Sequence, residues 1–181
     1  MSFIIETERL GLRQFTLDDA PAVLAFSSNE QVTEYTGDAG MIASIDDAEH
    51  VIRTIWLKEY RQHGYARYAL VHKADNKVIG FAGWKFIDED NMPDLGYRML
   101  PQYWGQGLGF EIALACMHYG KETLEFNHVF ADALPDNLGS CRIIEKLGFR
   151  YQKQYHFSED GFDLLINRYV ADLRQWQPPQ S

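Results

Sequence analysis

The sequence predicts a single α/β (α+β) domain in which helices pack on both faces of a mixed sheet. The spacing of apolar residues changes from helical to alternating near Tyr65, so both kinds of element are expected. The elements follow in the order strand, two helices, three strands, helix, strand, helix and two strands. That order suits one sheet of about six to seven strands. A length of 181 residues and a hydrophobic content of 46% fit one globular domain.

The N-terminal third contains one predicted strand and two predicted helices. The strand covers residues 4–15, where apolar and polar residues alternate loosely. A helix over 16–28 begins with the spacing of a variant capping box, formed by Thr16 and Asp19. A second helix is expected over 44–62, because a serine followed by two aspartates is typical of a helix start.

The rest of the chain alternates strands and helices more evenly. Gly148 is the residue type expected just past a helix end. The domain is expected to cover residues 1–174, followed by a frayed Pro/Gln-rich tail over 175–181. Strands are expected over 67–72, 78–87, 94–100, 129–133, 149–157 and 162–170, the last two joined by a turn at 158–161, and helices over 110–124 and 137–147.

Composition and charge exclude several classes of partner. The chain has 17 basic and 26 acidic residues, a net charge of −9, which disfavours nucleic acid. The N-terminus lacks the basic start of a secretory signal, and no apolar run is long enough to cross a bilayer. Cys116 and Cys141 lack the spacing of a zinc site and are expected to be buried free thiols. We therefore expect a cytoplasmic monomer or homodimer that uses no metal, nucleic acid or membrane.

The most informative segment is residues 97–111, in which a strand ends, glycines alternate and a long helix begins. Glycine permits positive φ and close approach of a ligand, and a helix N-terminus presents backbone N–H groups to an anion. A Walker loop is excluded because no Lys-Ser or Lys-Thr follows the glycines. A dinucleotide fingerprint is excluded because Phe110 stands where its third glycine would be. An anion site of another kind is expected, with a merely flexible turn as the alternative.

Three segments together resemble one superfamily. Residues 104–109, Trp-Gly-Gln-Gly-Leu-Gly, resemble the acyl-CoA pyrophosphate loop of the GCN5-related N-acetyltransferases (GNAT), with Trp104 where the general pattern has Arg or Gln. Residues 101–107 are similar to the branch that includes the ribosomal-protein N-terminal acetyltransferases. Residues 6–13 resemble the opening strand of that branch, and residues 137–149 resemble its Asn-x-x-Ser…Glu-Lys-x-Gly-Phe helix. The resemblance covers nearly the whole chain.

The resemblance implies a fold in which a splayed pair of strands binds the cofactor. It also implies an enzymatic activity. The implied activity is transfer of an acetyl group from acetyl-CoA to a primary amine by direct attack in a ternary complex. The acceptor is expected to be a protein N-terminus or a small amine. The backbone N–H of Met99 is expected to face the thioester carbonyl. The implied cofactor contacts are Met99, Leu100, Trp104, Gly105, Gln106, Gly107, Leu108, Gly109, Phe110, Asn137 and Arg142.

The resemblance also implies catalytic residues, each with an alternative. Asp94 lies where relatives often carry an acid and is the expected general base, unless a water chain serves and Asp94 is a solvated acid. Many members have a tyrosine where this chain has Ile144, so Ser140 is the expected general acid, unless it is a helix cap. The missing tyrosine keeps a noncatalytic CoA-binding module open as an alternative. The residues expected to line the acceptor pocket, unless they belong to the core, are Tyr35, Trp84 and Tyr97; ordinary packing is expected of His72, His118 and His128.

The net charge must be reconciled with a polyanionic cofactor. Backbone N–H groups at the helix start, with Arg142 and Lys146, are expected to hold the cofactor without a basic surface. The surplus acid is then expected near the acceptor, where it would favour a protonated amine. On that basis, cationic acceptors should lose efficiency as salt rises.

Overall fold

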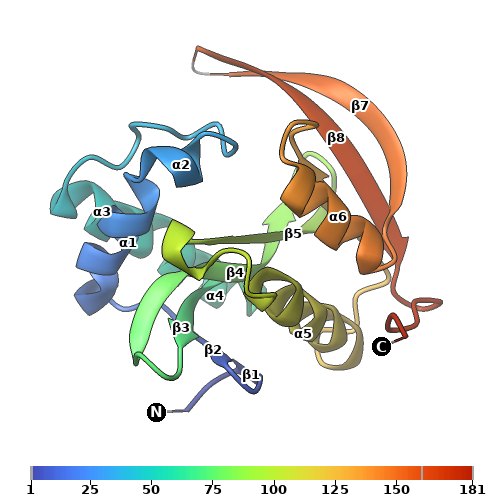
Figure 1. Cartoon of the computed structure of the whole chain (residues 1–181), viewed down its shortest axis with the longest axis horizontal. Coiled ribbons are helices and arrows are strands. Elements are labelled where there is room, and N and C mark those ends of the chain that lie inside the picture. The colour runs from blue at the N-terminus through green and yellow to red at the C-terminus, as the bar shows by residue number, and fades with distance from the viewer. Residues whose placement is uncertain (1, 160, 181) are drawn as a thin grey trace.

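The chain forms one mixed sheet with helices on both faces (Figure 1), as described by a computed structural model for residues 2–159 and 161–180. The strands of the described residues are β1 (Ile5–Glu6), β2 (Leu10–Arg13), β3 (Arg67–His72), β4 (Lys77–Ile87), β5 (Met92–Met99), β6 (His128–Ala133), β7 (Arg150–Glu159) and β8 (Phe162–Asp172). The α-helices are α1 (Ala20–Ser27), α2 (Glu30–Thr33), α3 (Ile45–Val51), α4 (Leu57–His63), α5 (Leu108–Glu122) and α6 (Leu138–Lys146). Short 3-10 turns cover Leu17–Asp19 and Pro101–Tyr103, and a π-helical segment, Ile52–Trp56, joins α3 to α4.

The strand order is β1-β2-β3-β4-β5-β6-β8-β7. Every neighbouring pair is antiparallel except β5 and β6, which run parallel and pair at Asp94 and Phe130. That is the single residue pair between the described parts of β5 and β6, so the two strands are unpaired beyond it. The splayed strand pair that the resemblance implies is therefore β5 and β6.

The predicted fold class is confirmed, and the described residues contain eight strands where six to seven were expected. The extra strand arises because residues 4–15 fold as a hairpin of β1 and β2. Thr7 makes the turn: its amide donates to the Leu10 carbonyl at 2.9 Å, and its hydroxyl accepts from the Leu10 amide at 3.0 Å. Hydroxyl side chains stabilise such turns locally, a signal that strand periodicity does not contain.

The helices begin where their capping residues predict. The Asp19 carboxylate accepts from the Thr16 amide at 2.8 Å, and the Ser44 hydroxyl accepts from the Asp47 amide at 3.1 Å. The short helix α2 was not predicted. Its N-cap is Asn29, whose side chain accepts from the amides of Gln31 and Val32.

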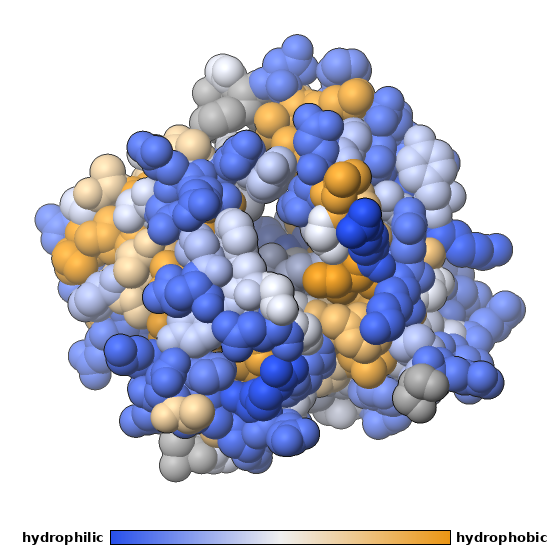
Figure 2. All heavy atoms as spheres, in the orientation of Figure 1, coloured by the Kyte–Doolittle hydropathy of each residue, from blue (hydrophilic) through white to orange (hydrophobic). Residues whose placement is uncertain are grey.

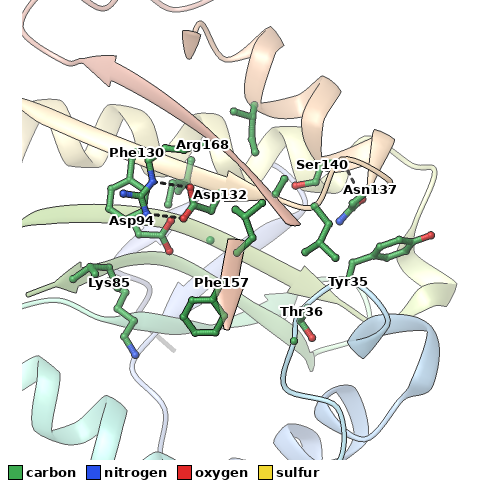
Figure 3. A pocket seen from close by; sticks show the side chains of 18 of the residues that line it. Tyr35, Thr36, Lys85, Asp94, Phe130, Asp132, Asn137, Ser140, Phe157 and Arg168 are labelled. Atoms are coloured by element: carbon green, nitrogen blue, oxygen red, sulfur yellow. Dashed lines mark hydrogen bonds and ion pairs between the residues drawn. The ribbon is translucent and has the colours of Figure 1, made fainter. Parts of the chain in front are cut away.

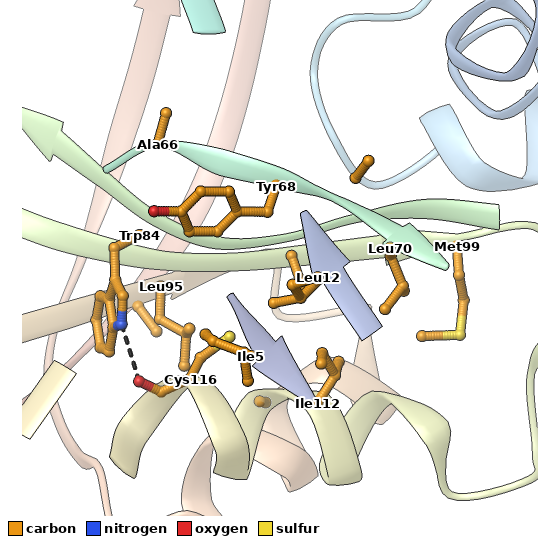
Figure 4. Close-up of a cluster of buried hydrophobic side chains, with 14 of the residues drawn as sticks. Ile5, Leu12, Ala66, Tyr68, Leu70, Trp84, Leu95, Met99, Ile112 and Cys116 are labelled. Atoms are coloured by element: carbon orange, nitrogen blue, oxygen red, sulfur yellow. Dashed lines mark hydrogen bonds between the residues drawn. The ribbon is translucent and has the colours of Figure 1, made fainter. Parts of the chain in front are cut away.

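The core lies on both faces of the sheet. On one face, the Trp84 indole points at α5 and donates to the Cys116 carbonyl at 2.9 Å (Figure 4). On the other face, Phe26 of α1 and Trp56 pack edge-on against Phe81 of β4. Cys116 is buried and carries a free thiol, and Cys141 is likewise buried and free, as predicted. No helix of residues 2–159 and 161–180 has the length and apolarity needed to cross a bilayer.

The prediction of a frayed tail over 175–181 was wrong at Trp176, near the start of that tail. Trp176 is 6% exposed, its indole donates to the Leu147 carbonyl at 2.7 Å, and its own carbonyl accepts from Lys121 at 2.6 Å. A buried tryptophan anchors this end to the domain, which the Pro/Gln composition around it conceals. Two residues of predicted segments, Asp160 in the turn at 158–161 and Ser181 in the tail, lie outside the described residues.

We expect Trp176→Ala to lower the free energy of unfolding by about 3 kcal/mol, because it empties a buried site and removes an indole hydrogen bond. Chemical denaturation measures the effect. Deletion of residues 177–181 is the matched control and should change stability little, since residues 177–180 are mostly exposed. Equal losses in the two variants would contradict this role for Trp176.

Candidate active site

Two cavities open beside the splay between β5 and β6, and they meet. The splay cavity, of about 880 Å³, extends from residues 35–37 to strands β7 and β8. The loop cavity, of about 430 Å³, lies against residues 104–107, the glycine segment that precedes α5. Figure 2 shows a hollow near the centre of the face in view. The residues common to both linings are Tyr35, Thr36, Tyr97, Arg98, Asn137 and Ser140.

The glycine segment ends in an open helix N-terminus. Gly107 is the N-cap of α5 and has a φ of 79°, a conformation that L side chains rarely adopt. No side chain of the described residues caps α5. The first N–H groups of a helix have no partner inside it, so those of Leu108, Gly109 and Phe110 are available to an anion. The loop cavity therefore fits a phosphorylated ligand at this end.

Most of the predicted cofactor residues line the loop cavity. Gln106 and Leu100 do not: the Gln106 side chain donates to the Gln102 carbonyl at 3.1 Å, and the Leu100 amide donates to the Ile79 carbonyl at 2.9 Å. Arg142 is exposed on α6 and lines neither cavity. Those that line the loop cavity are Met99, Trp104, Gly105, Gly107, Leu108, Gly109, Phe110 and Asn137.

The end of β5 presents backbone groups to the splay. Met99 lies opposite Gly80 of β4, one residue from the hydrogen bond between Leu100 and Ile79. Hydrogen-bonded pairs alternate along an antiparallel ladder, so the N–H and C=O of Met99 point away from β4. The Met99 carbonyl accepts from the Trp104 indole at 2.8 Å. The Met99 N–H therefore faces the space between β5 and β6, where a bound ligand would contact it.

Two hydroxyl groups meet where the cavities join. The Tyr97 and Ser140 hydroxyl oxygens are 3.2 Å apart. Asn137 is the N-cap of α6, and its side chain accepts from the Ser140 amide at 3.2 Å, so the Ser140 hydroxyl is not the helix cap. Burial raises the pKa of Tyr97 to about 12, against the opposing hydrogen bond from Ser140. Both hydroxyls therefore carry a proton at neutral pH.

Asp94 lies in the splay cavity at the point where β5 and β6 part. Its carboxylate forms an ion pair with Arg67, and Arg67 also donates to the Asp94 carbonyl at 2.7 Å. Burial raises the pKa of Asp94 to about 6, against the opposing charge of Arg67. Gly96 leaves room for this pair, because a side chain at that position would displace the Arg67 guanidinium. Figure 3 shows Asp94 toward one end of the cavity and Ser140 toward the other.

Several charged residues of the splay cavity were missed by the sequence analysis. Arg168 donates to both carboxylate oxygens of Asp132, at 2.9 and 2.8 Å (Figure 3). Arg168 also forms an ion pair with Asp90. Arg98 pairs with Asp38 at 2.9 Å and ties residues 35–38 to β5. For Asp132 the available signal was a charge between apolar residues of β6, since a buried charge needs a partner.

Three expectations are corrected or qualified. Trp84 does not line either cavity; it is 1% exposed and packs against α5, because its position in β4 faces that helix. The surplus acid is not gathered around the acceptor, because the described lining of the splay cavity has five basic and four acidic side chains. The prediction that cationic acceptors are used less efficiently as salt rises therefore has no support from this lining.

His72, His118 and His128 line neither cavity, and each contacts a charged side chain elsewhere.

Comparisons with known proteins agree with this architecture. Residues 9–150 match the acetyltransferase (GNAT) domain. The chain is 31% identical over 158 residues to an uncharacterized N-acetyltransferase, YoaA, of Bacillus subtilis (strain 168), covering 85% of this chain and 88% of that relative. The crystal structure of a GNAT-family acetyltransferase from Bacillus anthracis has a TM-score of 0.80 at 20% identity, covering 94% of this chain and 99% of that one.

A second solved structure is a ribosomal L7/L12 α-N-protein acetyltransferase in complex with coenzyme A. Its TM-score is 0.78 at 18% identity, and the match covers 94% of this chain and 98% of that one. The present chain belongs to the GNAT family and is an N-acetyltransferase of that family. The resemblance to the ribosomal-protein acetyltransferases is supported at the level of fold.

Proposed function

We propose that this protein transfers an acetyl group from acetyl-CoA to a primary amine that enters the splay cavity. The observation that carries the proposal is the junction of the two cavities at Tyr97 and Ser140. One cavity ends at an open helix N-terminus suited to phosphate, and the other is wide enough for a separate acceptor. Such a junction lets both reactants be held at once, and proximity in one complex lowers the barrier to direct transfer.

The loop cavity fits the acetyl donor. The backbone N–H groups of Leu108, Gly109 and Phe110 take the diphosphate, at the cavity wall that Gly107 also lines. The Met99 N–H orients the acyl end at the splay. Lys146, whose ammonium lies 4.0 Å from the centre of the Phe110 ring, adds positive charge near the helix start. Acetyl-CoA, when bound, supplies an acyl group already activated as a thioester.

Asp94 accepts the proton of the acceptor amine through water, because it lies toward the end of the splay cavity away from Ser140. An ordinary aspartate is a weak base at neutral pH, whereas a pKa raised to about 6 brings Asp94 closer to the working range. Arg67 keeps the carboxylate in place and limits how far burial can raise its pKa. Asp94 is thus ionised near pH 7 and is still able to hold a proton.

The hydroxyl pair of Tyr97 and Ser140 returns a proton to the leaving sulfur. Ile144 of α6 occupies the place of the tyrosine found in many family members, but Tyr97 of β5 brings a phenol to Ser140 from another direction. Either hydroxyl can donate its proton to the sulfur and take one in turn from the other hydroxyl, and the pair then recovers the lost proton from water. The missing helical tyrosine is therefore compatible with catalysis.

We expect Ser140→Ala and Tyr97→Phe each to lower kcat by about tenfold to hundredfold, with little change in the KM for acetyl-CoA. Tyr155→Phe is the matched control: it removes another hydroxyl of the splay cavity, one that donates to Asp132 at 2.6 Å. Thiol release measured with a fixed acceptor checks the prediction. A loss in Tyr155→Phe as large as in the other two variants would count against a role for the hydroxyl pair.

The acceptor is proposed to be a protein N-terminus or a small primary amine. One structural neighbour acts on a ribosomal protein, and the volume of the splay cavity leaves room for several residues of a peptide. The test is a thiol-release screen with pooled small amines and peptides with free N-termini, followed by mass spectrometry of the acetylated product. An acetylated member supports the proposal. CoA binding without thiol release across the panel would favour the noncatalytic module instead.

A further inference from the structure

The Arg9 side chain bonds the hairpin of β1 and β2 to both the glycine segment and the start of α5, where the Thr7 hydroxyl also donates to Glu111 at 2.6 Å. Its Nη1 donates to the Gln106 carbonyl at 2.9 Å, and its Nε donates to Glu111 at 2.7 Å. The Arg9 Nη2 lies 2.6 Å from the same Glu111 carboxylate. Arg9 and Glu111 are 102 positions apart in the chain, so this contact exists only in the folded protein.

The contact with the Gln106 carbonyl sets the direction of the next N–H group. In a planar trans peptide the C=O and the following N–H point in opposite directions. With its carbonyl turned to Arg9, residue 106 leaves the Gly107 N–H pointing away from Arg9. Glycine at both 105 and 107 permits other orientations of this peptide, and the hydrogen bond selects one.

The contact with Glu111 removes an electrostatic conflict. Glu111 lies in the first turn of α5, beside the N–H groups that would take a diphosphate. Burial acts to raise the pKa of Glu111, but hydrogen bonds from Thr7 and Arg9 outweigh it and hold the pKa below its usual value. The carboxylate is thus ionised, and without Arg9 its charge would repel a bound phosphate.

We infer that Arg9 is a positioning residue for the donor: it orients the peptide before Gly107 and neutralises Glu111, so that the glycine segment accepts a diphosphate. The inference rests on the proposed use of acetyl-CoA. The Arg9 side chain is 42% exposed, so solvent screens part of its charge, and a moderate effect is expected.

The test is calorimetric titration of the full chain with CoA. Arg9→Ala should weaken binding about tenfold, because a charge-assisted hydrogen bond and the charge balance are both lost. Arg9→Ala/Glu111→Gln should recover part of that loss, and Arg9→Lys should lie between wild type and Arg9→Ala. Lys73→Ala is the matched control: it removes a cation that pairs with Glu6 of the same hairpin and should leave binding unchanged.

A kinetic readout separates positioning from loss of structure. Arg9→Ala should raise the KM for acetyl-CoA with kcat nearly unchanged, and it should not affect use of acetyl-pantetheine, which lacks the diphosphate. Binding by Arg9→Ala equal to that of Lys73→Ala would overturn the inference, as would a double variant that binds no better than Arg9→Ala. Failure of the wild-type protein to bind CoA would instead overturn the proposed function.

Discussion

Gly107→Glu should abolish measurable binding of CoA while the chain remains folded. Gly107 has a φ of 79° and lines the loop cavity beside the open end of α5. A glutamate there strains the backbone and adds a negative charge at the helix N-terminus, beside Arg9. These effects act together on the anion site, so we expect a loss of at least about a hundredfold, measured by calorimetric titration.

Gly64→Glu is the matched control for this variant. Gly64 has a φ of 81° at the end of α4, and a Cβ added there meets nothing within 4 Å. It introduces the same strain and the same charge away from both cavities, so CoA affinity should be unchanged. A folded Gly107→Glu protein that binds CoA as tightly as Gly64→Glu would exclude the glycine segment as the diphosphate site.

Asp94→Asn should lower kcat/KM about a hundredfold or more at neutral pH, as expected when a general base is removed. The wild-type pH profile provides a second readout. Asp94 must be ionised to accept a proton, so kcat/KM should fall as the pH drops through about 6, the raised pKa of this group. An aspartate with an ordinary pKa would place that fall near pH 4. The Asn variant should lack this limb of the profile.

Asp90→Asn tests whether the effect belongs to Asp94 or to any carboxylate of the splay cavity. Asp90 forms an ion pair with Arg168 in the same cavity. Its amide variant should retain most of the activity and the fall near pH 6. If Asp94→Asn kept the same acidic limb as wild type, a water chain or another group would have to be the base.

Local signals in the sequence predicted most of the fold. The strand over 67–72 has the predicted bounds, and the helix over 137–147 differs by one residue at each end. The glycine segment was also predictable, because positive φ and an open helix start are properties of neighbouring residues. Caps, turns and periodicity all act within a few positions, so a single sequence contains them.

What the sequence did not reveal depends on contacts between distant residues. The partner of Asp94 is Arg67, 27 positions away, and the partner of Ser140 is Tyr97, 43 positions away. Trp84 was misplaced because alternation shows that a strand has two faces but not which face meets a cavity. The pKa of Asp94 likewise follows from burial and from Arg67, both consequences of the assembled sheet.

The central claim is that the loop cavity binds acetyl-CoA, and the most direct measurement is a titration of the wild-type chain with CoA in a calorimeter. We predict saturable binding at one site per chain, abolished by Gly107→Glu and retained by Gly64→Glu. Absence of binding at millimolar CoA, in protein shown to be folded by its melting transition, would contradict the account.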